Sequence, residues 1–242
     1  MPPPDFLSYL STHQLNANGA EPDASHLPSL NDLSKELGLS VASLREQLEV
    51  AKAIGLVEVR PRTGIRRLPY SFLPAVRQSL SYAISVDWSY FLTFADLRNH
   101  LEAAYWDEAA RSLTPEDHQK LGSLVARAWD KLRGQPVHIP HPEHRQLHLT
   151  IFSRLDNPFV YGLLEAYWEA YEAVGLNLFA DYNYLEQVWG YHQQMVDGIC
   201  SGDFEASYQA MVAHKDFFFQ RPDTQAISQQ PSAISRQPVA NR

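Results

Sequence analysis

The sequence predicts a mainly α-helical protein in two parts: a small N-terminal unit that includes a β-hairpin, and a larger all-helical bundle. Apolar residues recur at helical spacing along most of the chain, and alternation typical of strands is confined to residues 55–68. Between the two parts, residues 69–74 lose helical periodicity. Apolar residues make up 45% and charged residues 20% of the 242 residues, a balance that excludes a wholly disordered chain.

The N-terminal elements follow from capping and stop signals. Residues 29–37 predict a short helix that ends at Gly38, and residues 40–54 predict a second helix that begins after Ser40, a residue type favoured at the N-cap. Alternation on both sides of a Pro/Thr/Gly turn then predicts a hairpin over residues 55–68. Two helices joined by a three-residue turn and followed by a hairpin form a winged helix-turn-helix pattern.

The rest of the chain predicts a bundle of six or seven helices. Proline at the first helical position supports two of their starts, after Thr114 and after Asn157. The expected segments are 75–87, 94–113, 115–133, 141–155, 157–178, 184–201 and 203–219. The predicted organisation is a winged-helix unit at 1–68, a linker at 69–75, an all-helical unit at 76–220 and a disordered Gln/Ser/Pro-rich tail at 221–242.

Composition restricts the function classes. The beginning of the chain lacks the charge and apolar pattern of a secretory signal, and no apolar run approaches a membrane span, so we expect a cytoplasmic protein without membrane contact. Cys200 is the only cysteine, which excludes an internal disulfide and a thiolate metal cluster. The net charge of −8 argues against nonspecific polyanion binding, yet residues 59–86 hold five arginines and no acid. We therefore expect any anionic partner to meet the first third of the chain.

Four histidines lie on three predicted helices. His144 and His148 are four residues apart and share one helical face, whereas His192 and His214 lie on two further helices. Each has apolar neighbours on its own face, which is typical of a buried position. Four converging imidazoles would bind a transition metal, but a single buried histidine is more often a core residue. Spacing alone leaves both interpretations open.

The run LPSLNDLSKELGLSVASLREQLEVAKAIGLVEVRPRTG, residues 27–64, resembles the DNA-reading head of GntR-type repressors. The resemblance implies that the second helix enters the major groove with Arg45 at base or phosphate distance, and that the wing arginines lie near the DNA backbone. The family has arginine where this chain has Asn31 and Val41, which implies altered specificity or weaker binding. The DNA-facing residues expected from this resemblance are Asn31, Ser40, Val41, Arg45, Arg62, Gly64 and Arg66.

Three later motifs resemble the helical FCD effector domain of the FadR subfamily: LRNHLEAAYWDEAA, RQLHLTIFSRLDNPFV and HQQMVDGICSGDFEASYQAMVAH. Many members bind a divalent metal through one aspartate and three histidines. The resemblance implies that His148, His192 and His214 are the histidine ligands and that His144 occupies the aspartate position. A fourth imidazole shifts the preference from hard cations to Zn, with Ni and Cu as alternatives. The other alternative is a site that holds no metal.

The same resemblance implies a small carboxylate effector, with Arg98 as its clamp, although Arg98 and Glu102 are also spaced to form a simple core ion pair. The predicted function is a ligand-responsive transcription factor, a homodimer on a palindromic double-stranded DNA operator. Two alternatives remain. One is a metal-dependent hydrolase. The sequence lacks the H-E-x-x-H, nucleophile-elbow and phosphate-loop motifs of such enzymes, so we do not expect an enzyme. The other is a former repressor whose head is now only a dimer contact or a protein contact.

Overall fold

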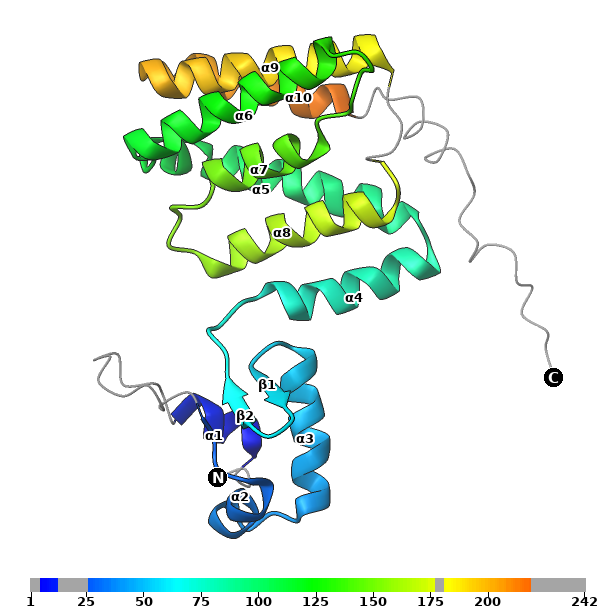
Figure 1. Cartoon of the computed structure of the whole chain (residues 1–242), viewed down its shortest axis with the longest axis vertical. Coiled ribbons are helices and arrows are strands. Elements are labelled where there is room, and N and C mark those ends of the chain that lie inside the picture. The colour runs from blue at the N-terminus through cyan, green and yellow to red at the C-terminus, as the bar shows by residue number, and fades with distance from the viewer. Residues whose placement is uncertain (1–4, 13–25, 177–180, 219–242) are drawn as a thin grey trace, which may run out of the picture. The chain divides into compact units, whose positions relative to one another are not determined.

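The computed structural model describes residues 5–12, 26–176 and 181–218, which form two compact units divided between Ala75 and Val76. Over these ranges it has ten helices and one two-stranded antiparallel sheet (Figure 1). The mainly helical fold class with a small hairpin is confirmed. No helix in the described ranges has the length and apolar character needed to cross a membrane.

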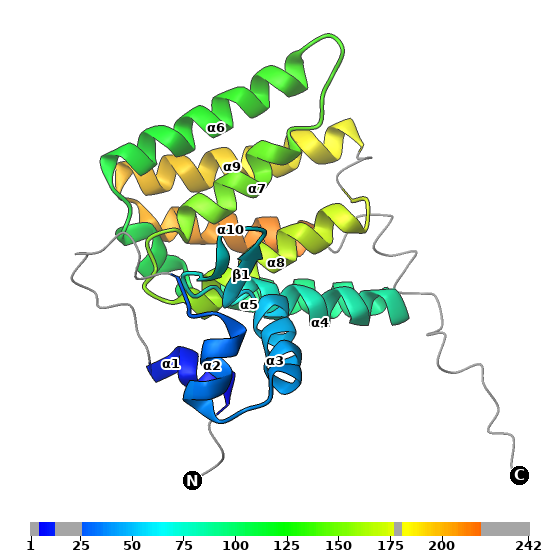
Figure 2. The same ribbon diagram turned by 60° about the horizontal axis from the view of Figure 1, so that its bottom comes forward.

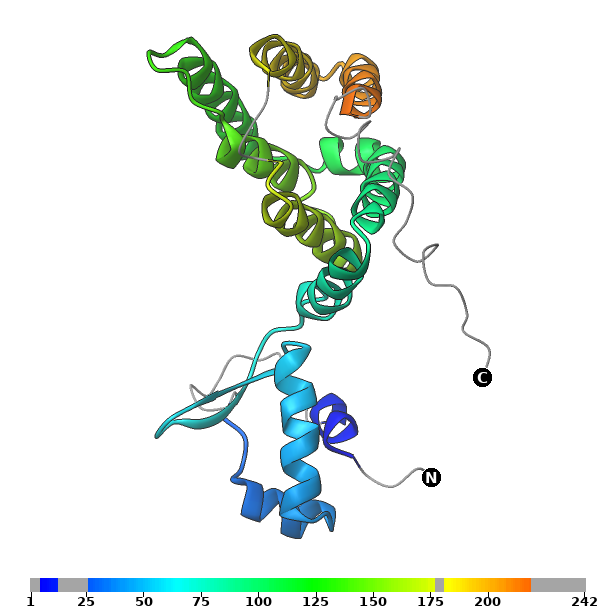
Figure 3. The same ribbon diagram turned by 90° about the vertical axis from the view of Figure 1, so that its right-hand side faces the viewer.

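The first unit combines three helices with the hairpin. Strands β1 and β2 pair in antiparallel register from Val57↔Arg67 to Arg60↔Gly64. In Figure 3, α1 lies beside α3, in agreement with the contacts between these helices. The elements are α1 (Phe6–Thr12), α2 (Leu30–Leu37), α3 (Val41–Ala53), β1 (Val57–Arg60) and β2 (Gly64–Arg67).

The helix-turn-helix forms where its caps predict it. The Ser29 side chain accepts a hydrogen bond from the backbone N–H of Asp32, which satisfies one of the free amides at the start of α2. Gly38 ends α2 in the left-handed conformation at φ +67°, which glycine adopts without steric cost. The Ser40 hydroxyl then accepts from the N–H of Ser43 at 3.1 Å and starts α3.

Helix α1 was not expected from the sequence, yet it completes the core of the first unit. Its side chains Phe6, Tyr9 and Leu10 are buried against the inner faces of α2, α3 and the hairpin. The backbone N–H of Phe6 donates to the Gln47 side chain on α3. The Arg67 guanidinium, at the end of β2, donates to the carbonyl of Leu10. Helix α1 therefore connects the second helix of the helix-turn-helix to the hairpin.

The second unit is a helical bundle. It begins at Val76, so the first three residues of α4 belong to the first unit. Helix α6 packs against α7 and α9, α9 packs against α10, and α5 contacts α8 and α10 (Figure 2). The elements are α4 (Leu73–Val86), α5 (Ser89–Arg111), α6 (Pro115–Arg133), α7 (His141–Ile151), α8 (Pro158–Ala173), α9 (Tyr182–Ser201) and α10 (Phe204–Phe218). Residues 73–75, which we expected in the linker, are helical, and the expected disordered tail lies outside the described residues.

The bundle core is large and aromatic. Trp106, Phe152 and Trp189 have at most 1% of their surface exposed, and the Trp106 and Phe152 rings meet edge to face at 6.0 Å. Burying one such side chain stabilises the fold by roughly 1.5–3 kcal/mol. This core holds α5, α6, α7, α8, α9 and α10 against one another, and four of them, α5, α7, α9 and α10, carry the candidate site.

Candidate metal centre and DNA-facing surface

The four histidines come together inside the bundle. His144 and His148 project from α7, His192 from α9 and His214 from α10. One ring nitrogen of each lies within 4.8 Å of a ring nitrogen of every other, and Nε2 of His148 is 3.1 Å from Nε2 of His192. Three of the rings are buried and His144 is nearly so. This is the convergence that the spacing in the sequence left open.

Local packing between α9 and α10 brings two of the imidazoles together. The helices turn at Gly202 and approach so closely that a Cβ placed on Gly198 would lie 2.8 Å from Cβ of Ser207. The buried Ser207 hydroxyl donates to the carbonyl of Met195 across this contact. The ring centres of His192 and His214 are 4.4 Å apart as a result.

Aromatic side chains surround His144. The ring centres of Trp168, Trp189 and Tyr171 lie 4.6, 6.1 and 6.4 Å from the centre of its imidazole. Two aromatic side chains of α8, Trp168 and Tyr171, thus form part of the wall of the site. Such a wall excludes water from the ring nitrogens.

Burial sets the protonation state of the cluster. It lowers the pKa of His144, His192 and His214 well below the usual value, and the neighbouring histidines and Arg98 lower each pKa further. Burial also lowers the pKa of His148, against the opposing effect of a nearby carboxylate. All four rings are therefore neutral near pH 7, which is the form that binds a metal.

Glu102 orients one of the four rings. Its Oε1 lies 3.1 Å from Nδ1 of His148, and the Nη2 of Arg98 lies 2.9 Å from the same oxygen. Burial alone would raise the pKa of Glu102, but Arg98 and His148 outweigh it and hold the pKa below its usual value. The carboxylate is thus charged, and it favours the tautomer in which Nδ1 of His148 donates to it. Nη2 of Arg98 lies 2.8 Å from the same Nδ1, can only donate, and favours the opposite tautomer. The tautomer that Glu102 favours turns the Nε2 lone pair toward the centre of the cluster.

Arg98 is engaged within the core. Only 4% of its surface is exposed, it pairs with Glu102, and its guanidinium carbon lies 4.8 Å from the centre of the Tyr167 ring. The core ion pair that the sequence left as an alternative is therefore present. Arg98 is not among the residues that line the cavity between α4 and α8 or the opening beside His144.

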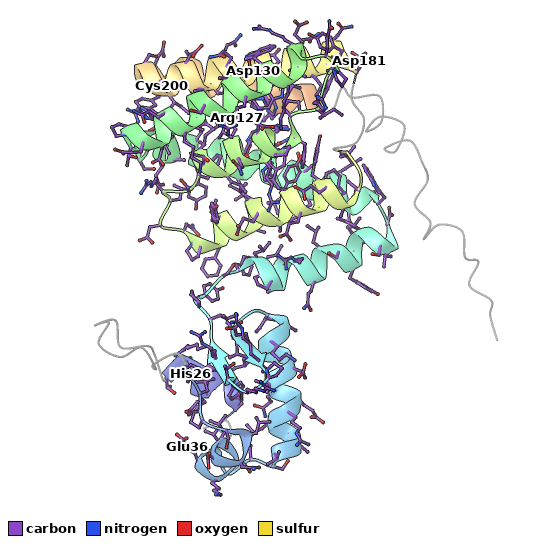
Figure 4. All side chains as sticks on the ribbon, viewed as in Figure 1. His26, Glu36, Arg127, Asp130, Asp181 and Cys200 are labelled. Atoms are coloured by element: carbon purple, nitrogen blue, oxygen red, sulfur yellow. The ribbon has the colours of Figure 1, made fainter. Side chains whose placement is uncertain are left out.

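The donor set fits a borderline transition metal. His144 Nε2 and His192 Nδ1 are buried, and neither has a hydrogen-bond partner among the described residues. Four imidazoles suit Zn, Ni, Cu or Co, whereas Mg and Ca prefer oxygen. Figure 4 shows Cys200 at the opposite end of α9 from Asp181, and the thiol is not part of the cluster.

Two pockets differ sharply in size. The opening beside His144 holds about 20 Å³ and is lined mainly by aromatic and aliphatic side chains, among them Tyr171, Tyr184 and Trp189. A larger cavity of about 380 Å³ lies between α4 and α8. Arg77 at its edge is held by Glu169 through two hydrogen bonds of 2.5 and 2.7 Å. The larger cavity contains none of the four histidines.

The helix-turn-helix presents the expected reader residues in different ways. Arg45 is exposed on α3, and Asn31 is exposed in the first turn of α2. Val41, the first residue of α3, is half-buried, and the Ser40 hydroxyl serves as the cap of the same helix. The exposed residues beside Arg45 include the acids Glu46 and Glu49, which the resemblance to the GntR reader head does not imply as DNA contacts.

The wing arginines have unequal surroundings. Arg60 and Arg66 both lie near Glu58, at 2.9 and 3.8 Å, so this acid offsets part of their charge. Arg67 serves the fold through its bond to α1, as described above. Arg62 lies in the turn at φ +71°, two residues before Gly64, which begins β2 at φ +78°. The sequence did not indicate the ion pairs of Glu58 or the hydrogen bond from Arg67 to α1, because these contacts depend on how the segments pack.

A family model supplies the deciding comparison: the FCD domain matches residues 93–217, more than half of the chain. The chain belongs to the GntR-type regulators with an FCD domain. The FCD match contains all four histidines, Arg98 and Glu102, and the expected DNA-facing residues precede it. Membership supports a ligand-responsive transcriptional regulator rather than an enzyme.

One solved structure shows the same fold at low sequence identity, and two others match this chain less well. Streptococcus agalactiae GntR is 19% identical, with a TM-score of 0.58 over 80% of this chain and 88% of that one. Lar, which controls the expression of the Listeria monocytogenes agr system, is 16% identical over 81% and 86% of the two chains, with a TM-score of 0.48. E. coli McbR/YncC is 18% identical over 88% and 97%, with a TM-score of 0.43. No curated protein matches this FCD regulator in sequence.

Proposed function

We propose that this FCD regulator binds a divalent transition metal through His144, His148, His192 and His214, and couples this site to DNA binding by the winged helix. One observation carries the metal proposal: four neutral, largely buried imidazoles offer nitrogens within 4.8 Å of one another. When bound, the metal would supply a concentrated positive charge and a Lewis-acidic centre. Zn is the first candidate, with Ni and Cu as alternatives.

Other residues of the bundle support the site. Glu102 would hold His148 in the metal-binding tautomer, and Arg98 would keep Glu102 charged. The effector class expected from the FadR subfamily is a small organic acid. Arg98 now forms a buried ion pair with Glu102. To bind the carboxylate of an organic acid, its guanidinium would first have to break this pair.

The head would read DNA as one half of a homodimer on a palindromic operator. Arg45 on α3 would contact bases or phosphate, and Arg62, Gly64 and Arg66 would bring the wing to the DNA backbone. Because arginine is missing at Asn31 and Val41, the operator would differ from those read by relatives that have both. A reader helix with a single arginine would rely more on the wing.

The test measures metal content and DNA binding in parallel on the full chain. Purified wild type is compared with His192→Ala and with His100→Ala, a control whose side chain is 72% exposed on α5. We expect about one equivalent of metal in wild type and in the control, and loss of metal in His192→Ala. Equal metal content in all three proteins would refute the proposed site.

A second candidate function for the head rests on its surface charge. Glu46 and Glu49 lie on the exposed side of α3 beside Arg45, which disfavours a polyanion and suits a protein contact. Binding to the DNA upstream of the protein's own gene, measured at several salt concentrations, separates the two. A linear fall of log affinity with log salt supports the DNA reader. No salt-dependent binding to that DNA supports the protein contact.

A further inference from the structure

We propose that the regulatory signal is the transition-metal ion itself, which binds and leaves the four-histidine site, rather than an organic molecule seated on a permanently bound ion. This inference rests on the proposed function and names its effector. Three features of the four-histidine site support this inference: the charge of its ligands, the volume of the opening beside it and the spacing of its nitrogens.

The donor set has no negative charge of its own. All four ligand positions are imidazoles, and the nearest carboxylate, Glu102, already pairs with Arg98. A divalent ion would therefore add two positive charges to a buried region without a charged ligand to offset them. A carboxylate in place of His144 would remove one of these charges. The present set should release its ion more readily, so that occupancy follows the supply of metal.

The opening that the described residues leave beside His144 is too small for an organic effector. It holds about 20 Å³, enough for about one water molecule. Pockets for small organic ligands are usually about 300–1,000 Å³. Its lining contains no lysine or arginine, its second histidine, His141, is hydrogen-bonded to Glu172, and Arg98 is held in its ion pair. A metal ion needs only the space between the rings.

Binding would also change the spacing of three helices. A tetrahedral site with metal–nitrogen distances of about 2.0–2.1 Å places neighbouring nitrogens about 3.3 Å apart. His148 and His192 are already close to this at 3.1 Å, whereas the cluster as a whole extends to 4.8 Å. Metal would draw α7, α9 and α10 together around its ligands. Because these helices pack against α5, α6 and α8, the contraction would reach most of the bundle.

The experiment titrates metal without any organic ligand. Chelator-treated full-length protein is mixed with fluorescent DNA from upstream of its own gene, and anisotropy is followed as buffered free Zn²⁺ is raised, with Mg²⁺ as the control cation. We expect at least a tenfold change in DNA affinity with Zn²⁺, equal to about 1.4 kcal/mol of coupling, and none with Mg²⁺. His100→Ala should keep the response and His192→Ala should lose it.

A second variant keeps the test valid if His192→Ala does not fold. His144→Asp adds a negative ligand, so we expect it to bind Zn²⁺ at least tenfold more tightly and to shift the DNA response to lower free Zn²⁺. Equal Zn²⁺ affinity in His144→Asp and wild type would contradict the charge argument.

The outcomes distinguish this inference from the proposed function. If Zn²⁺ binds to the four histidines without changing DNA affinity, metal is not the signal, but the proposed metal site stands. A change in DNA affinity on addition of acetate or citrate would make this outcome clearest. A failure of Zn²⁺ to bind would overturn both. Salt-dependent DNA binding that responds to Zn²⁺ alone would support both.

Discussion

Gly198→Ala tests whether the close approach of α9 and α10 builds the site. A Cβ at this position would lie 2.8 Å from the Asp203 carbonyl oxygen and from Cβ of Ser207, and 2.9 Å from the Ser207 backbone nitrogen. Ordinary contact begins at 3.4 Å, so the helices would have to separate by about 0.6 Å. Two of these atoms belong to the backbone, and no side-chain rotation relieves the overlap.

The separation has two expected consequences. Overpacking of this kind costs about 1–3 kcal/mol, which would lower the melting temperature of the bundle by roughly 2–10 °C. Metal–ligand distances tolerate only about 0.2 Å of error, so moving His192 away from His214 by about 0.6 Å should weaken Zn²⁺ binding at least tenfold.

Gly190→Ala is the matched control in the same helix. A Cβ there meets no atom within 4 Å, and alanine in place of glycine inside a helix stabilises it by up to about 1 kcal/mol. Thermal unfolding of the chelated proteins and Zn²⁺ titration by calorimetry measure both effects. If Gly198→Ala matched Gly190→Ala in melting temperature and Zn²⁺ affinity, the packing argument would be refuted.

Three further predictions concern the surroundings of the site, the fold and the head. Glu102→Gln removes the charge that orients His148, and we expect Zn²⁺ affinity, measured by competition with a chelating dye, to fall 10–100-fold. Hydrogen bonds from Arg154 and the Thr114 cap lower the pKa of Asp117 from 3.8 to about 2. Because the folded-state pKa is depressed, this stabilisation is present above pH 3.8 and is lost as the pH falls toward 2. Asp117→Asn should cost about 1–2 kcal/mol at pH 7 and almost nothing near pH 2, as measured by urea unfolding; an equal cost at both pH values would contradict the assignment. Arg45→Ala should weaken operator binding by about 1–3 kcal/mol, whereas Arg62→Ala should weaken binding to all sequences and reduce the salt slope by about 1, both measured by anisotropy; identical effects of the two changes would argue against separate roles.

Local signals predicted most of the fold. Ser29 and Ser40 cap their helices as expected, Gly38 ends α2, and proline starts α6 at residue 115. These features depend on a few neighbouring residues, which the sequence displays directly. Helix α1 was missed because seven residues after a run of prolines provide too few turns for a periodic signal. Its stability comes from burial against α3, which is a tertiary contact.

The candidate site was predictable only in part. The spacing of His144 and His148 placed them on one face, but their distance from His192 and His214 depends on how three helices pack. A family resemblance, rather than periodicity, indicated that convergence. The competing roles of Arg98 could not be separated in the sequence, because a clamp and a core ion pair use the same residue at the same spacing. The Gly198 contact with α10 likewise becomes visible only when the helices are assembled.

X-ray absorption at the zinc edge, recorded on the full-length protein loaded with one equivalent of Zn²⁺, tests the central claim most directly. A site built from His144, His148, His192 and His214 predicts a first shell of nitrogen at about 2.0–2.1 Å with the multiple scattering of imidazole rings. A first shell containing sulfur, or oxygen without imidazole scattering, would contradict the four-histidine site.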